Sequence, residues 1–145
     1  MGDIFAIADI EPEILEVGGF KYRKTKKYKY EAMEVYEAAT GILGYQCDSH
    51  FAHLAPNGML TIDLGFLWNG ASGPAIDTKS FMRSSALHDA LYGFMISGQL
   101  PHRFRDECDD LLKEWSLQDG MGRRRAGYVR WAVGKFGARW MKIGR

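Results

Sequence analysis

The segment His88-Asp89-Ala90-Leu91-Tyr92 carries the residue types with the most chemical potential in this sequence. Residues three or four apart share one face of a helix, so His88 would lie beside Tyr92, while Asp89 would point about 100° further round. A histidine can serve as a general base near neutral pH, and a carboxylate can orient that base or bind a cation. The segment therefore predicts either a small hydrolytic site or a buried hydrogen-bonded cluster.

Asp109 is the expected partner of His88. The chain predicts two antiparallel helices joined by a short connection near residues 98–101, so residues similarly distant from that connection lie at nearly the same height, at about 1.5 Å of rise per residue. His88 and Asp109 satisfy this condition, whereas Asp106, one turn earlier, is less well placed and Asp110 points elsewhere. Pairing with Asp109 would fix the tautomer of His88 and leave its other ring nitrogen to deprotonate a water.

Asp89 is expected to face the Gly-rich segment that precedes this helix. Backbone carbonyls of such a loop, together with a carboxylate, form a hard oxygen site that suits calcium. The loop positions with this potential are Trp68, Asn69, Gly70 and Ala71. Asn69 offers a neutral oxygen where an aspartate would hold a cation more strongly, so the predicted calcium site is weakened at that position.

The same polar residues also fit a purely structural hypothesis. Buried polar groups must be paired in any protein, so Ser72, Asp77, His88, Asp89 and Asp109 could form a polar core without any turnover. Trp68 and Tyr92 would then be core aromatics. A salt bridge from Asp89 to an arginine such as Arg83 or Arg105 would favour this hypothesis.

Composition indicates one soluble domain. The chain has 145 residues, of which 46% are hydrophobic and 26% charged, and a formal net charge of +1. That charge gives the whole molecule no reason to bind nucleic acid, although residues 21–29 and 123–145 are locally basic. Cys47 and Cys108 are too far apart in the sequence for a zinc motif. We expect no signal peptide and no transmembrane segment.

The predicted fold is α+β, a single domain over 1–145 with a mainly β region at 1–68 and a loop plus three helices at 69–145. A near-alternating pattern predicts a small antiparallel sheet, and Pro56-Asn57-Gly58 favours a tight turn. Strands are expected at Phe20 to Tyr30, Glu31 to Glu37, Gln46 to Leu54 and Met59 to Asp63. Helices are expected from Asp77 or Thr78 to Ser97, from Pro101 to Gly120, and from Arg123 to Ile143.

Two resemblances follow from these motifs. The run Phe66-Leu67-Trp68-Asn69-Gly70-Ala71-Ser72-Gly73-Pro74, the HDALY helix, the acidic helix with Asp109 and the closing YVRWAVGKFG together resemble a small family of unknown function found in tailed phages and prophages. That family usually has aspartate at the position of Asn69. The resemblance implies a phage-encoded protein in the host cytoplasm or the virion, with a phage structural protein or a host protein as partner.

More distantly, the order of motifs is similar to the bacterial and fungal branch of the secreted phospholipases A2. That resemblance implies a phospholipase A2-like three-helix core, in which His88 activates water, Asp109 orients it, Tyr92 donates a supporting hydrogen bond and Asp89 binds calcium. It also implies a lipid or membrane surface as partner. The expected function is hydrolysis of a phospholipid ester; the alternative is a non-catalytic virion, tail or accessory protein that binds a partner protein through its aromatic and basic surfaces. Nucleic acid is the least expected partner.

Overall fold

The part of the chain that the structure describes folds into two antiparallel sheets and three α-helices. The computed structural model describes residues 12–27, 29–70 and 78–143, with side chains described as far as Gly137. Within these ranges each sheet has four strands. The α+β class is therefore confirmed, whereas the expectation of one small sheet was wrong.

The first sheet has the strand order β1-β2-β3-β8 and the second has the order β4-β7-β6-β5. Every pairing in both sheets is antiparallel. The strands of the first sheet are β1 (Ile14–Val17), β2 (Phe20–Lys26), β3 (Lys29–Ala32) and β8 (Leu67–Asn69). Those of the second are β4 (Tyr36–Ala39), β5 (Cys47–Asp48), β6 (Ala52–Leu54) and β7 (Met59–Ile62).

Several predicted strands are divided by turns. The segment Phe20 to Tyr30 is a hairpin in which Lys26 pairs with Lys29, so basic residues crowd its tip instead of alternating along one strand. Ser49 ends β5 by accepting the Ala52 amide on its hydroxyl oxygen, which divides the predicted strand from Gln46 to Leu54. The expected strand Glu31 to Glu37 is split between β3 and β4. β1 and β8 were not predicted, because short edge strands carry little periodicity.

The helix boundaries follow the sequence signals closely. The helices are α2 (Lys79–Ile96), α3 (Arg105–Gln118) and α4 (Arg123–Ile143), and a short 3-10 turn, η1 (His102–Phe104), leads into α3. Gly98 and Gly120 follow α2 and α3 with φ of 82° and 97°, which glycine adopts without steric cost. Asp77, the other expected cap of α2, lies outside the described residues.

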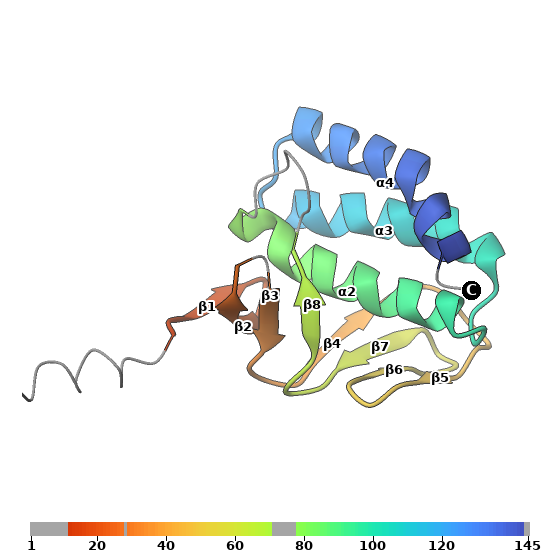
Figure 1. Ribbon diagram of the computed structural model, residues 1–145, viewed down its shortest axis with the longest axis horizontal. Coiled ribbons are helices and arrows are strands. Elements are labelled where there is room, and N and C mark those ends of the chain that lie inside the picture. The colour runs from red at the N-terminus through yellow and green to blue at the C-terminus, as the bar shows by residue number, and fades with distance from the viewer. Residues whose placement is uncertain (1–11, 28, 71–77, 144–145) are drawn as a thin grey trace, which may run out of the picture.

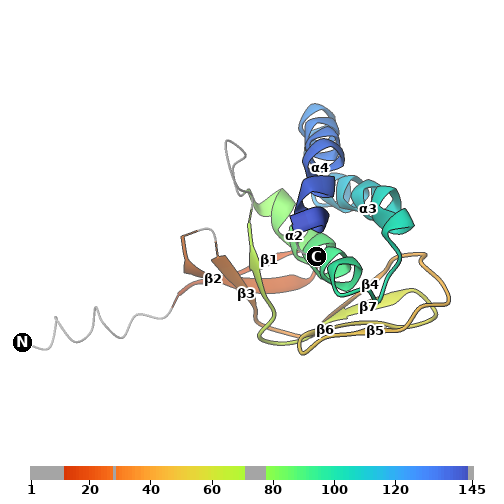
Figure 2. The same ribbon diagram turned by 45° about the vertical axis from the view of Figure 1, so that its right-hand side comes forward.

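Helix α2 occupies the centre of the molecule. It lies across the two sheets on one side, and α3 and α4 lie on its other side (Figures 1 and 2). Residues around most of its circumference are buried, including Met82, Ala86, Leu87, Leu91 and Phe94. The main hydrophobic core joins α2 to both sheets and to Trp115 of α3, and a smaller cluster around Leu112 and Val129 joins α3 to α4.

Three smaller features concern cysteines, a histidine and membrane helices. Cys47 and Cys108 are both buried and unbridged. His102 is half-buried, and its Nε2 lies 2.9 Å from the Met95 carbonyl oxygen. In the part of the chain that the structure describes, no helix is long and apolar enough to cross a membrane.

Arg83 joins α2 to three other parts of the fold. Its guanidinium donates to Asp119 beyond the end of α3 at 2.9 Å, to the Tyr36 hydroxyl of β4 at 3.0 Å and to Gln118 at 3.1 Å. Burial alone would lower the pKa of Arg83, but the hydrogen bond and charge of Asp119 raise it overall. A Cβ at Gly18 would lie 2.7 Å from Asp119 Oδ1 and 2.8 Å from Arg83 Nε, so the β1–β2 turn depends on glycine at this position.

Replacing Arg83 with methionine is expected to destabilise the fold by about 3–5 kcal/mol, because it leaves the buried Asp119 carboxylate without its cation. Lys21→Met is the matched control, since it breaks the exposed Lys21–Glu34 pair and should cost less than about 1 kcal/mol. Urea unfolding of both variants measures these free energies. Equal losses in the two variants would contradict the assigned importance of Arg83.

His53 forms a clamp on the outer side of the second sheet. Its Nδ1 lies 3.0 Å from Asp48 of β5 and its Nε2 lies 2.8 Å from Asp63, just after β7. The hydrogen bonds to Asp48 and then to Asp63 raise the pKa of His53 above its ordinary 6.5. The protonated ring can donate to both carboxylates at once. His53, in β6, therefore links its strand to β5 on one side and to the end of β7 on the other.

The His53 clamp predicts a pH-dependent contribution to stability. Because the pKa is raised in the folded state, the stabilisation is complete below the unfolded pKa and is lost as pH rises through the folded pKa. The Tm difference between the wild type and His53→Gln should therefore be largest below pH 6.5 and shrink above the raised pKa. His50→Gln, a nearby exposed histidine without such partners among the described residues, is the control. A Tm difference that stays constant across this range would rule the clamp out.

Candidate functional site

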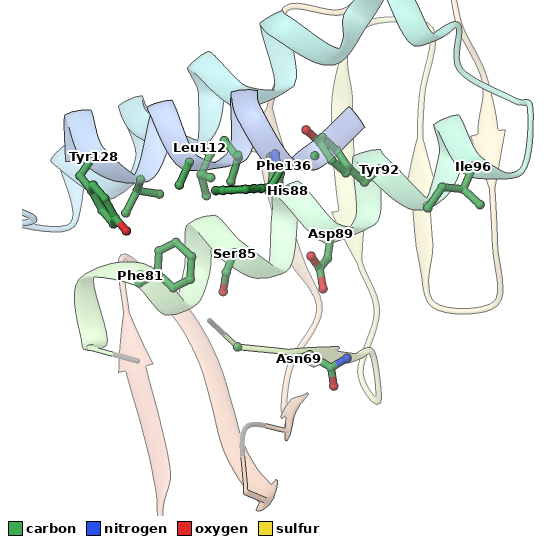
Figure 3. Close-up of a pocket in the computed structure, with 16 residues that line it drawn as sticks. Asn69, Phe81, Ser85, His88, Asp89, Tyr92, Ile96, Leu112, Tyr128 and Phe136 are labelled. Carbon is green, nitrogen blue, oxygen red and sulfur yellow. The ribbon is translucent and has the colours of Figure 1, made fainter. Parts of the chain in front are cut away.

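A cavity of about 460 Å³ lies between α2, α4 and the end of β8. Figure 3 shows side chains from α2 and α4 facing each other across it, with Asn69 at its lower edge. Most of its lining is apolar, and the polar residues gather near the middle of α2. The polar part of the lining consists of Asn69, Gly70, Ser85, His88, Asp89 and Tyr92. The apolar part includes Phe81, Ile96, Leu112, Tyr128, Val133 and Phe136.

His88 and Asp109 form the predicted contact. The His88 Nε2 lies 2.7 Å from Asp109 Oδ1, which joins the middle of α2 to the first turns of α3. Asp109 has no exposed surface, and His88 is 6% exposed where it lines the cavity. With Nε2 directed at a carboxylate, the Nδ1 atom is the ring nitrogen left for a molecule in the cavity, and no described residue hydrogen-bonds it.

Tyr92 lies one turn after His88 and shares its partner. The Tyr92 hydroxyl donates to Asp109 Oδ1 at 2.5 Å, and its ring centroid lies 4.1 Å from that of His88. Burial, and then the hydrogen bond to Asp109, raise the pKa of the Tyr92 hydroxyl, so it remains a proton donor. One carboxylate oxygen therefore faces two donors from α2, and the histidine ring has little freedom to turn.

Arg130 of α4 is a further member of this cluster that sequence reasoning missed. Asp109 Oδ2 is buried without a hydrogen bond, and the nearest cation is the Arg130 guanidinium at 3.7 Å. Arg130 is itself held by Asp110 at 2.8 Å and lies 3.8 Å from Asp106. Asp110 thus points away from His88, as expected. The acidic run of α3 could have indicated a basic partner, but not which of the many arginines would meet it.

Asp89 projects from α2 toward the end of β8 (Figure 3). Desolvation by the surrounding protein raises the pKa of its carboxyl to about 7, and a hydrogen bond from the Asn69 backbone opposes that rise. Over a third of the Asp89 surface is nonetheless open to solvent. Among the described residues, Asp89 forms no salt bridge: Arg83 pairs with Asp119, and Arg105 donates to the Gly134 carbonyl.

The described residues supply only part of a calcium site. Trp68 and Asn69 belong to strand β8 instead of a loop, and successive carbonyls of an extended strand point in opposite directions, so they cannot both face one ion. Trp68 does not line the cavity; its indole N–H donates to Ser85 at 3.1 Å. Asp89, Asn69 and Gly70 do line it, but calcium takes six to eight oxygens. The described residues also contain no group of three or more metal-binding His, Cys, Asp or Glu side chains.

Of the residues in the structural hypothesis, His88 and Asp109 are in direct contact. Ser85, which that hypothesis did not include, accepts a hydrogen bond from Trp68 and donates one to the Met82 carbonyl. Trp68 is a core aromatic, 4% exposed, whereas Tyr92 is half-buried at the site. Ser72, Asp77 and Ala71 lie outside the described residues. The arrangement is thus an oriented histidine beside a mainly apolar cavity, and a histidine held in this way can act as a general base.

Gly137 controls how closely α4 approaches Tyr92. A Cβ at this position would lie 2.6 Å from the Tyr92 hydroxyl, while a Cβ at Gly127, on the same helix, would meet nothing within 4 Å. Gly127→Ala should raise stability by about 0.5–1 kcal/mol through its helix propensity. Gly137→Ala gains the same propensity but must displace the Tyr92 hydroxyl from Asp109, so it should be destabilising. Thermal unfolding compares the pair, and stabilisation by both substitutions would contradict the close approach.

Comparison of the chain with protein-family models, with curated proteins and with solved structures found no match in any of the three. The two resemblances described above therefore depend on their motifs alone. The observations that bear on the function of this protein are the geometry of the cavity and of the residues that line it.

Proposed function

We propose that this protein hydrolyses an acyl ester of a phospholipid, with His88 as general base and Asp109 as the residue that orients it. The observation that carries the proposal is the 2.7 Å contact between His88 Nε2 and the buried Asp109, made where His88 lines a mainly apolar cavity. This is the arrangement that the distant resemblance to phospholipases A2 implies.

The reaction follows from the free ring nitrogen. His88 Nδ1 takes a proton from a water, and the water oxygen attacks the ester carbonyl carbon. When the tetrahedral intermediate collapses, the bond between this carbon and the alcohol oxygen breaks, and the proton passes from Nδ1 to the leaving alcohol. Asp109 accepts the hydrogen bond from His88 Nε2 and stabilises the ring while Nδ1 carries the proton. We assign the oxyanion to the polar part of the cavity near Asn69 and Gly70. If calcium binds, Asp89 with Asn69 and Gly70 would hold it, and it would polarise the ester carbonyl.

The cavity wall supports an apolar substrate. Phe81, Leu112, Val133 and Phe136 line the space next to His88, and a hydrocarbon chain gains free energy when it leaves water for such a surface. A small polar ester would leave this surface unused. The apolar lining therefore favours a substrate with a hydrocarbon chain, and the His88–Asp109 pair favours hydrolysis.

A non-catalytic role is the second candidate. The same cluster ties α2 to α3, and the fully buried Asp109 would need its partners in a purely structural protein too. On this reading the chain is a phage virion, tail or accessory protein, in the virion or the host cytoplasm, and it binds a phage or host protein.

The two candidates differ in what His88→Gln should do. The hydrolase proposal predicts that wild-type protein releases fatty acid from dispersed phospholipid and that His88→Gln lowers the rate by about 10²–10⁴. Asp109→Asn should also lower it, while His50→Gln, on the second sheet, should leave it unchanged. Fatty-acid release is measured with calcium and with a chelator, and circular dichroism verifies that each variant is folded.

No release by the wild type under either condition would reject the hydrolase proposal. The structural candidate instead predicts that His88→Ala mainly lowers the Tm, at a cost of about 1–3 kcal/mol, because a buried Asp109 acceptor loses its donor. A lower Tm for His88→Ala, no fatty-acid release by the wild type, and recovery of the protein in purified phage particles would together favour that candidate.

A further inference from the structure

Helix α4 has two faces of different composition, 180° apart. At 3.6 residues per turn, Ala126, Val129, Val133 and Gly137 share one face, and this face packs on α2 and α3. The opposite face carries Arg124, Tyr128, Trp131 and Lys135, which we call the outward stripe. All four residues of the stripe are exposed.

The outward stripe is rich in aromatic side chains, although the part of the chain that the structure describes buries none of its residues. Tyr128 and Trp131 are 52% and 54% exposed, and Phe136 beside them is 52% exposed. Ring contacts connect the three, with centroids 6.0 Å apart for Tyr128 and Trp131 and 6.3 Å apart for Trp131 and Phe136. The Lys135 ammonium lies 5.1 Å from the Trp131 ring centroid. Clustered exposed aromatics of this kind mark a binding surface.

The charge of this helix selects an anionic partner. Residues 123–137 include five arginines and lysines and no acidic residue. Arg130 pairs with Asp110 and Arg125 donates to Thr78, so the exposed Arg123, Arg124 and Lys135 are the cations that would meet an outside anion. Tyr and Trp combine an apolar ring with a polar group, so they suit a boundary between water and an apolar phase, and cations beside them suit anionic headgroups.

Continuity with the cavity favours a lipid surface over another polyanion. Tyr128 and Phe136 belong to the exposed cluster and also line the cavity that contains His88. Figure 3 shows both residues on the α4 side of this cavity. A nucleic acid could use the cations and the rings but has no apolar chain to place in such a cavity.

We propose that the outward stripe docks the protein on an anionic lipid surface, with the cavity opening beside that surface. The choice of lipid rests on the proposed function, but the docking itself does not require turnover. An acyl chain could then pass from the bilayer to the cavity along Tyr128 and Phe136 without crossing bulk water.

The test is vesicle co-sedimentation of the full chain carrying His88→Gln, which prevents turnover. Vesicles of phosphatidylcholine alone are compared with vesicles of equal parts phosphatidylcholine and phosphatidylglycerol. We expect binding to the anionic vesicles that weakens with salt, about fivefold weaker binding for Lys135→Gln, and about tenfold weaker binding for Trp131→Ala. A blue shift of tryptophan emission on binding should be lost in Trp131→Ala.

Matched controls come from exposed residues elsewhere. Phe51→Ala, at an exposed aromatic of the second sheet, and Lys24→Gln, in β2, should bind as the parent protein does. Equal binding to both vesicle types, equal losses in stripe and control variants, or binding to DNA but not to vesicles would each overturn the proposal.

The outcome also separates this inference from the proposed function. Stripe-dependent binding of vesicles by wild-type protein that releases no fatty acid would support the docking face and reject the hydrolase. Hydrolysis of monomeric short-chain phospholipid without any vesicle binding would support the hydrolase and reject the docking face.

Discussion

Helix α2 lies between the sheets and the other two helices, so nearly every polar side chain it carries must find a partner inside the protein. Arg83 finds Asp119, Ser84 finds Ser116 at 2.7 Å, Ser85 accepts from Trp68, and His88 meets Asp109. These partners come from α3, from β8 and from the segment after α3. Each pair fixes one neighbouring element against α2, and together they fix the height and rotation of the helix.

The candidate site is a consequence of this constraint. Asp109 is completely buried, so it must be compensated by His88, Tyr92 and Arg130 whether or not a reaction occurs. The contact that would orient a catalytic base is thus the same contact that stabilises the packing of α2 on α3. Substrate activation and helix packing therefore place the same requirement on this one contact.

Helix α4 gives the site its apolar character and its opening. Small residues on its inner face, such as Ala126 and Gly137, allow it to approach α2 and α3 closely, and larger side chains beside them line the cavity. Its outer face has no such packing role, yet it carries a cluster of aromatic rings. A helix that helps to close a cavity on one side and exposes aromatics and cations on the other connects the interior of the site with a surface.

The features that could be predicted from the sequence are those that depend on local physics. The three helices and their glycine ends follow from periodicity and backbone freedom, and the His88–Asp109 contact follows from antiparallel helix geometry. The division into two sheets, the short strands β1 and β8, and the partnership of Arg130 with Asp109 were decided only by the tertiary structure. Edge strands and arginine partners depend on contacts between residues far apart in the chain, and no local pattern specifies them. Strand β8 changed the candidate cation site for the same reason, because pairing with β3 extends a segment whose composition favours a loop.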